Sequence, residues 1–465
     1  MMACGSPSNE VVDEFKKLVI RMNPPRVTVD NTSDMAATLV KVDSANKYGT
    51  LLEVAQVLTD LKLTIKRAYI SSDGEWFMDV FHVVDQDGNK LYDGQVIDRI
   101  ELSLGAGSLS FRAPDRSVGV EADAKAEQTA IELTGRDRPG LLSEVFAVLT
   151  DLKCNIVASE VWTHGARMAA LVYVTDADTL GAIDSQDRLD TVKRLLRHVL
   201  CGSSRDEVCA RAAIPGRVAA HAPRRLHRMM HDDHVGLHGS ESAAADADDG
   251  RRSRPVVEVV NCAERDYTLV NVRCRDRPKL LFDTVCTLTD MRYVVFHGTV
   301  IADGSEAYQE YYIRHLNDIP IVSGDERDRL ACCLEAAIER RNAEGLRLEL
   351  CCEDRVGLLS DVTRIFREHG LSVTHAEVAT RGARAANVFY VVDASSGEPV
   401  QVQAVQAVRA EIGEQILFVR KDDVGSGGPK SPPTRRDAGR RSLGNMIRSR
   451  SEKFLYNLGL IRSCS

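Results

Sequence analysis

A four-fold repeat constrains this chain more than any other feature of its sequence. Four segments align on one anchor residue each, at Gly49, Gly140, Lys279 and Gly357. An acid always stands four residues after the anchor, an apolar residue nine after it, and a glycine twenty-five after it. Because the anchors are unevenly spaced, the repeat predicts four globular modules with connections of variable length, and not a regular solenoid.

Each module has the same order of expected elements. An alternating apolar run before the anchor predicts a half-buried strand, as at 129–133, and the residues after it have helical spacing, as at 141–152. Two alternating runs that meet at the later glycine predict a hairpin. A second helix and a short last strand follow, as at 187–200 and 415–419. The expected order is βαββαβ, an α+β ferredoxin-like fold with antiparallel sheets.

These modules divide the chain. We expect a linker rich in Ala, Asp and Gly between the second and third modules to be largely disordered, although Arg224–Met230 has the pattern of a short amphipathic helix. Histidines in a flexible linker lack the fixed geometry of a metal site, so no metal is expected at the five found there. They are His221, His227, His231, His234 and His238. The expected parts are an N-terminal segment (1–34), modules at 35–115, 126–202, 264–342 and 344–421, the flexible linker (203–262) and a basic tail (422–465).

Composition excludes several classes of protein. The net charge of −8 does not favour specific nucleic-acid binding, and no apolar run reaches the roughly 18 residues of a transmembrane segment. Twelve cysteines without a framework spacing indicate reduced thiols, so we expect an intracellular protein, cytoplasmic or nuclear. Phosphate-binding, dinucleotide-binding, serine-hydrolase and zinc-protease motifs are missing. We therefore expect no catalytic residues, no cofactor and no enzymatic activity.

The loop Asp137-Arg138-Pro139-Gly140-Leu141-Leu142 resembles the signature of the ACT domain, a regulatory unit that binds amino acids. Four such copies with little else resemble the plant ACT domain-repeat (ACR) proteins, and residues 17–23 and 454–461 are similar to that family too. The resemblance implies a non-enzymatic amino-acid-binding regulator whose modules pair side by side, within the chain or in a homodimer. Its regulatory protein partner is unknown. Glutamine is suggested as ligand only by analogy with bacterial sensors that end in the same domains.

The loop between the first strand and first helix is the expected ligand site. Unpaired N–H groups at a helix start attract a carboxylate, and glycine lets a ligand approach the backbone closely. An acid or amide beside the loop can accept from an ammonium group. The candidate ligand-binding residues are Asp137, Gly140 and Leu141; Asp354, Gly357 and Leu358; Asn46 and Gly49; and Asp276.

Several alternatives stay open. The loop acids are also ordinary helix caps, and the modules can serve as a protein-interaction scaffold without a small-molecule ligand. Lys279 replaces the anchor glycine, so the third loop is the one expected to be closed, while Tyr48 either covers the first loop or stacks on a ligand. The basic tail is a docking helix, a contact for anionic membranes or, at 435–441, a nuclear import signal.

Overall fold

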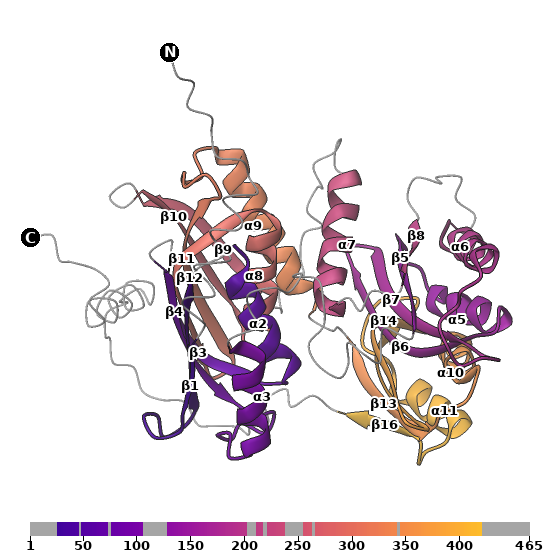
Figure 1. Ribbon diagram of the computed structural model, residues 1–465. Coiled ribbons are helices and arrows are strands. Elements are labelled where there is room, and N and C mark those ends of the chain that lie inside the picture. The colour runs from indigo at the N-terminus through magenta and orange to yellow at the C-terminus, as the bar shows by residue number, and fades with distance from the viewer. Residues whose placement is uncertain are drawn as a thin grey trace, which may run out of the picture.

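Two antiparallel sheets of eight strands each form the frame of the protein (Figure 1). The computed structural model describes residues 26–45, 48–72, 76–105, 128–201, 211–216, 221–237, 254–262, 266–341 and 345–420. Residues 17–23, Asn46 and the basic tail, on which expectations were placed, lie outside them. Each sheet joins two modules, the first with the third and the second with the fourth, and we call the two halves the 1/3 sheet and the 2/4 sheet.

Modules 2 and 4 confirm the expected βαββαβ order. The 2/4 sheet has the strand order β16-β13-β15-β14-β6-β7-β5-β8. Module 2 consists of β5 (Thr129–Arg136), α5 (Leu141–Asp151), β6 (Cys154–His164), β7 (Arg167–Asp176), α6 (Gln186–Cys201) and β8 (Arg211–Gly216). Module 4 consists of β13 (Leu346–Glu353), α10 (Leu358–Glu368), β14 (Leu371–Arg381), β15 (Arg384–Asp393), α11 (Val402–Ile412) and β16 (Leu417–Arg420).

Modules 1 and 3 share the α+β fold but take their outer strand from the preceding residues. The 1/3 sheet has the order β1-β2-β4-β3-β11-β12-β10-β9. Module 1 consists of β1 (Arg26–Asp30), β2 (Thr38–Ala45), α2 (Thr50–Asp60), β3 (Thr64–Ser71), β4 (Trp76–Val84) and α3 (Gly94–Leu104). Module 3 consists of β9 (Val256–Cys262), β10 (Tyr267–Arg275), α8 (Leu280–Asp290), β11 (Tyr293–Asp303), β12 (Glu306–His315) and α9 (Gly324–Glu339).

The outer position beside the first strand of each module accepts any antiparallel strand. In modules 1 and 3 a strand just upstream reaches it through a short connection, and β1 and β9 pair with β2 and β10. The segment 1–34 thus contributes one strand, β1, and the linker 203–262 contributes two, β8 to module 2 and β9 to module 3, all of which sequence patterning had left outside the modules.

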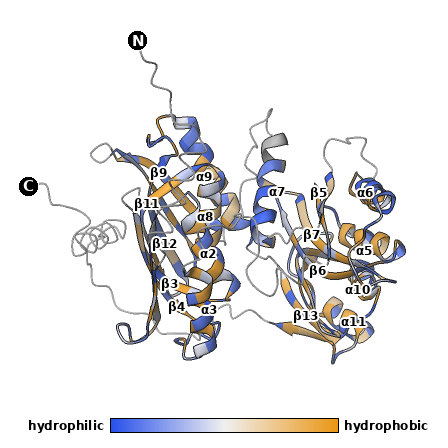
Figure 2. Ribbon diagram, in the orientation of Figure 1, coloured by the Kyte–Doolittle hydropathy of each residue, from blue (hydrophilic) through white to orange (hydrophobic). Residues whose placement is uncertain are grey.

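The seam of each sheet is the pairing of the strand that follows the first helix of each module. Val161 of β6 lies opposite Ala376 of β14, and Ala68 of β3 lies opposite Val300 of β11. The first helices consequently lie side by side, α5 on α10 and α2 on α8. Figure 2 shows hydrophobic residues along the strands and along α5, where one continuous core runs through both modules of the 2/4 half.

The linker contains a docked helix, α7 (Ala222–Leu237), so the expectation of a largely disordered linker is wrong for its described residues. The short amphipathic helix expected at 224–230 is confirmed and extended. Its buried Leu226, Met229 and Met230 pack on Trp162 and Leu171, on the face of the 2/4 sheet that faces away from α5 and α10. Strands β5 and β7 are therefore buried on both faces.

Helix α7 also contacts the other half of the molecule, and Figure 1 shows it standing between the two sheets. His227 Nε2 lies 2.7 Å from Asp283 Oδ1 on α8, and Arg224 Nη2 lies 3.1 Å from Asp290 Oδ1. Nε2 of His221, one residue before the helix, lies 2.9 Å from Asp60 Oδ1 on α2. These two histidines therefore form structural contacts between segments far apart in the sequence.

None of the described helices is long and apolar enough to cross a membrane.

Replacing Leu226 by alanine tests whether α7 is docked. The side chain is fully buried, so we predict that Leu226→Ala lowers the free energy of unfolding by about 2–5 kcal/mol, because it leaves a cavity against the sheet. Urea denaturation measures this loss. Leu195→Ala on α6, at a site 37% exposed, is the control and should change stability by no more than about 0.5 kcal/mol. An equally small effect at Leu226 would mean that the helix does not pack there.

Candidate ligand sites at the module seams

All four anchor residues adopt the left-handed backbone conformation at the start of a helix. Their φ angles are 90° at Gly49, 82° at Gly140, 65° at Lys279 and 83° at Gly357. The turn from strand into helix demands this conformation, which glycine adopts at least cost. Lys279 adopts it too, so the third loop has the same course as the others. No anchor makes a side-chain cap hydrogen bond.

An ion pair inside the loop fixes its shape. Arg138 binds Glu144 in a bidentate manner, with Nη1–Oε1 and Nη2–Oε2 distances of 2.8 and 2.5 Å. This hydrogen bonding by the guanidinium keeps the pKa of Glu144 below its usual value. The equivalent pairs are Arg277–Asp283 and Arg355–Asp361. The acid four residues after the anchor therefore holds the arginine of the loop in these three modules.

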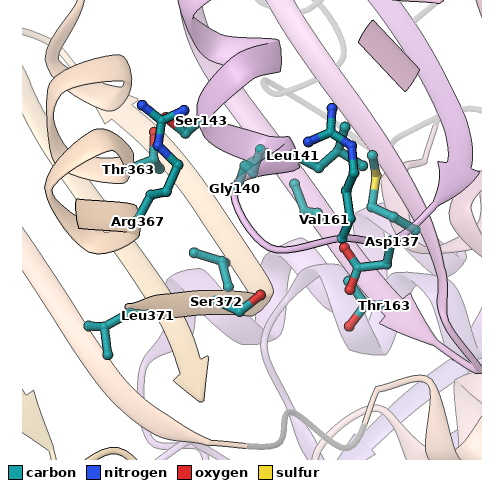
Figure 3. Close-up of a pocket in the computed structure, with 14 residues that line it drawn as sticks. Asp137, Gly140, Leu141, Ser143, Val161, Thr163, Thr363, Arg367, Leu371 and Ser372 are labelled. Atoms are coloured by element: carbon teal, nitrogen blue, oxygen red, sulfur yellow. The ribbon is translucent and has the colours of Figure 1, made fainter. Parts of the chain in front are cut away.

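A cavity lies at the seam between modules 2 and 4 (Figure 3). Its empty space is about 380 Å³, part of it open to solvent. One wall is the loop and first turn of module 2, with Asp137, Gly140 and Ser143, and the other is α10 and the start of β14 of module 4, with Thr363, Arg367 and Ser372. Neither module forms this cavity alone.

Arg367 is the functional candidate that sequence reasoning missed. The side chain is exposed on α10, and within the described chain its guanidinium has neither a hydrogen bond nor an ion pair. It passes so close to Gly140 that a Cβ on that residue would lie 2.7 Å from Arg367 Cδ. One feature of the sequence could have indicated it. Arg367 stands ten residues after its anchor, a position that is threonine in the other three modules, at Thr59, Thr150 and Thr289.

Asp137 lies on the other side of Gly140 from Arg367 (Figure 3). Its backbone N–H donates to the carbonyl of Ala166 at 2.9 Å, and burial raises the pKa of its half-buried carboxyl group. A nearby cation would stabilise the ionised form of such a group. The seam thus presents a guanidinium and a carboxyl group on either side of a glycine.

The other candidate loops differ in what occupies them. Asp354 Oδ2 accepts a hydrogen bond from Thr380 Oγ1 at 3.0 Å, and the nearest atom to a Cβ on Gly357 would be Thr150 Cγ2 at 3.5 Å. Leu141 and Leu358 are buried.

In module 1 the Tyr48 hydroxyl donates to the carbonyl of Thr289 in module 3, and a Cβ on Gly49 would meet no atom within 4 Å. The loop of module 3, which the loss of its glycine predicted to be closed, borders a cavity lined by Asp276, Lys279 and residues of module 1. Its empty space is about 400 Å³, part of it open to solvent.

Comparisons with known proteins agree with this architecture. Residues 33–110 match the family described as "ACR family N-terminal ACT domain", and residues 129–196 and 346–411 match "ACT domain". The ACT domain-containing protein ACR4 of Arabidopsis thaliana is 51% identical, covering 98% of this chain and 99% of that protein. The chain belongs to the ACR family of ACT domain-containing proteins. ACR5 of the same plant is 49% identical over 100% of both chains, and ACR6 is 53% identical over 88% of this chain and 92% of its own.

The matched ranges of this ACR family chain fall in modules 1, 2 and 4, and strand pairing defines module 3. A crystal structure of aspartate kinase from Synechocystis is also similar, with 12% identity and a TM-score of 0.15, covering 81% of this chain and 55% of that one. At such a score we draw nothing from the likeness.

Two glycine variants test the contact between the loop and α10. Gly357→Ala places a Cβ in ordinary contact at positive φ, so we predict a loss of about 1–2 kcal/mol of unfolding free energy from the backbone alone. Gly140→Ala should cost more, because its Cβ must also displace Arg367. Urea denaturation measures the loss of unfolding free energy in each variant. When Arg367 is also replaced by alanine, Gly140→Ala and Gly357→Ala should cost the same. A Gly140→Ala cost no larger than that of Gly357→Ala in the parent chain would contradict this contact.

Proposed function

We propose that this chain is a non-enzymatic sensor that binds a free amino acid at the seam between modules 2 and 4, inside the cell. The observation that carries the proposal is the placement of Arg367 and Asp137 on either side of Gly140. Membership of a family named for ACT domains supports it.

Arg367 is the proposed partner of the ligand carboxylate. A guanidinium binds a carboxylate through two parallel hydrogen bonds. This one has no hydrogen bond or ion pair to an acid in the described chain, although its charge lowers the pKa of nearby Glu144. The start of α5 adds backbone N–H groups and the positive end of the helix dipole. Since residue 140 has no side chain, the carboxylate can approach the backbone between these groups.

Asp137 is the proposed partner of the ligand ammonium group. The carboxyl group is held beside the loop by the backbone bond to Ala166, and it pays a desolvation cost that an ammonium group would offset. The ligand side chain would then lie against Val161, Met168 and Val373, which also line the cavity. Their apolar character favours an aliphatic or partly apolar side chain over a charged one.

Catalysis is not part of the proposal. The described lining contains neither histidine nor cysteine, and the Thr163 hydroxyl already donates to the carbonyl of Thr374 at 2.9 Å. The polar groups that line the cavity would therefore bind and position a ligand. Regulation would follow because the ligand contacts both modules at their seam. One strand of the seam, β6, also contacts α7, the helix that lies between the two sheets.

A protein-interaction scaffold without a ligand is the second candidate function. Two loops favour it. The Tyr48 hydroxyl beside the first already donates to Thr289 of module 3, and the Thr380 hydroxyl already donates to the carboxylate of Asp354 in the fourth. A test with amino acids separates the two functions.

Thermal unfolding of the purified chain with each of the standard amino acids at millimolar concentration is that test. A ligand that binds only the folded state adds about 2.7 kcal/mol at a hundred times its Kd. We predict a selective rise in Tm that Arg367→Ala abolishes. Arg364→Ala, three residues earlier on α10 and paired with Glu368, is the matched control and should keep the rise. No rise with any amino acid would favour the scaffold.

The affinity should depend on pH through Asp137. Its pKa is raised by burial, and only the ionised form accepts from an ammonium group, so binding is strong above that pKa and weakens as the pH falls through it. Calorimetric titrations between about pH 4 and pH 8 measure this. Asp137→Asn should weaken binding about tenfold at neutral pH, as expected for one charged hydrogen bond, and remove the dependence. Asp354→Asn is the control and should change neither, whereas an unaltered pH profile in Asp137→Asn would exclude this role.

A further inference from the structure

The contact between the 1/3 half and the 2/4 half centres on Asp283, a fully buried acid of α8. Two arginines of module 3 reach its carboxylate. Arg277 Nη1, from the loop before α8, lies 2.7 Å from Oδ2, and Arg341 Nε, from the residues after α9, lies 2.9 Å from the same oxygen. Nε2 of His227 on α7 lies 2.7 Å from Oδ1. Of these three side chains, the histidine alone changes its charge near neutral pH.

His227 also packs on the 2/4 half. Its ring centre lies 4.9 Å from that of Trp162 on β6, in an edge-on arrangement. Its helix neighbours Leu226, Met229 and Met230 pack on the same sheet face. Only 2% of the His227 side chain is exposed. The imidazole is therefore enclosed between the two halves, and one half supplies the carboxylate while the other supplies the aromatic surface.

The buried imidazole has a place for one proton. Nε2 donates to the carboxylate of Asp283, which leaves Nδ1 as the unprotonated nitrogen of the neutral ring. Nδ1 is buried and has no hydrogen-bond partner in the part of the chain that the structure describes, and the same holds there for Nη2 of Arg341. A second proton on the ring would add an unsatisfied N–H and a further positive charge to this cluster, and both are costly in a protein interior.

The charged groups around His227 come from several elements. They are Asp283 on α8, Arg277 on the loop before it, Arg340 and Arg341 just after α9, and Glu160 on β6 and Glu377 on β14, which act on Arg341. Burial chiefly lowers the pKa of His227, and the two arginines after α9 lower it further, whereas Asp283 raises it. A histidine exposed on a released α7 would titrate near its ordinary pKa of about 6.5. Below that pH the closed arrangement therefore binds fewer protons than the open one, and acid favours opening.

We propose that His227 makes the contact between the two halves dependent on pH. Its neutral ring holds α7 against α8, and protonation of Nδ1 breaks this contact and lets the halves separate. Water would then reach the unpaired nitrogens of the cluster. Each half stays folded, since each has a core of its own. The other polar contacts of this segment with the 1/3 half part in the same movement, and they are Arg224 with Asp290 and His221 with Asp60.

Small-angle X-ray scattering of the full chain between about pH 8 and about pH 5 tests this inference. We expect the radius of gyration to rise below about pH 6.5, and the ratio of open to closed molecules to grow by up to about tenfold for each pH unit. Far-UV circular dichroism should stay constant, because the halves separate without unfolding. In a Trp76→Phe chain, where Trp162 is the sole tryptophan, the emission maximum should shift to longer wavelength over the same range as Trp162 meets water.

His227→Gln is the decisive variant, because its amide can still donate to Asp283 but does not titrate. We expect this chain to stay closed down to about pH 5. His369→Gln is the matched control, since His369 is partly exposed and pairs with Glu411 inside module 4, and its response should equal that of the parent chain.

All measurements are made without a ligand, so their outcome does not depend on the proposed function. A parent chain that keeps its radius of gyration and its emission maximum at acid pH would overturn the inference. A His227→Gln chain that opens as the parent chain does would overturn it too, because the proton would then act elsewhere.

Discussion

Pairing of strand edges is the constraint on which the rest of this structure depends. A four-stranded module leaves unpaired N–H and C=O groups along its outer strands, and such edges must be covered. Here β6 covers β14 and β3 covers β11, each pair in antiparallel register. Because the paired strand directly follows the first helix, the pairing also sets α5 against α10 and α2 against α8.

This geometry places the loop of one module against the first helix of its partner. The anchor at the start of α5 meets Arg367 on α10, and the loop of module 3 meets Thr59 on α2. Any ligand at these loops touches two modules, so its binding energy depends on how the seam is packed. A single module would have the loop without the opposite wall.

A second constraint joins the two sheets. Asp283 is fully buried, which by itself raises its pKa, but Arg341, Arg277 and His227 outweigh that effect and keep the pKa well below the usual value. Removing one partner from such a network is costly, because a buried charge stays uncompensated. Arg341 also lies 3.5 Å from Glu160 and 4.6 Å from the ring centre of Trp162, both on the 2/4 sheet.

The same arginine sits near the 2/4 seam. Glu160 and Glu377 lie opposite each other across it, a pairing of like charges that is unfavourable alone. The hydrogen bond from His375 chiefly lowers the pKa of Glu377, to about 2, and Lys279 and Arg341 of module 3 lower it too. Charged groups of module 3 therefore act on the carboxylate pair at the 2/4 seam.

Local patterns predicted what is local in this fold. The repeated register predicted four modules and the element order, because the strand, anchor and helix of each copy are set by adjacent residues. The source of the outer strand in modules 1 and 3 was not predictable, since β1 and β9 compete for one position with segments after the second helix. Likewise Leu226, Met229 and Met230 formed an apolar stripe, but nothing local indicated which sheet face it covers.

Among the candidate site residues, too, those set by local sequence could be predicted and those set by module pairing could not. Asp137, Gly140 and Asp276 could be predicted because they belong to the repeated loop. Arg367 could not, because its importance depends on which modules meet. Lys279 reaches the same left-handed conformation as glycine, at a higher cost in backbone energy, so the third loop keeps the course of the others, and its closure to a ligand stays a prediction.

A crystal structure of the chain with the amino acid that raises its Tm most would test the central claim most directly. The proposed function predicts electron density for the ligand at the 2/4 seam, with its carboxylate on Arg367 and its ammonium group on Asp137. Ligand density bound only away from the loops and seams would contradict it, as would a seam that stays empty at saturating ligand.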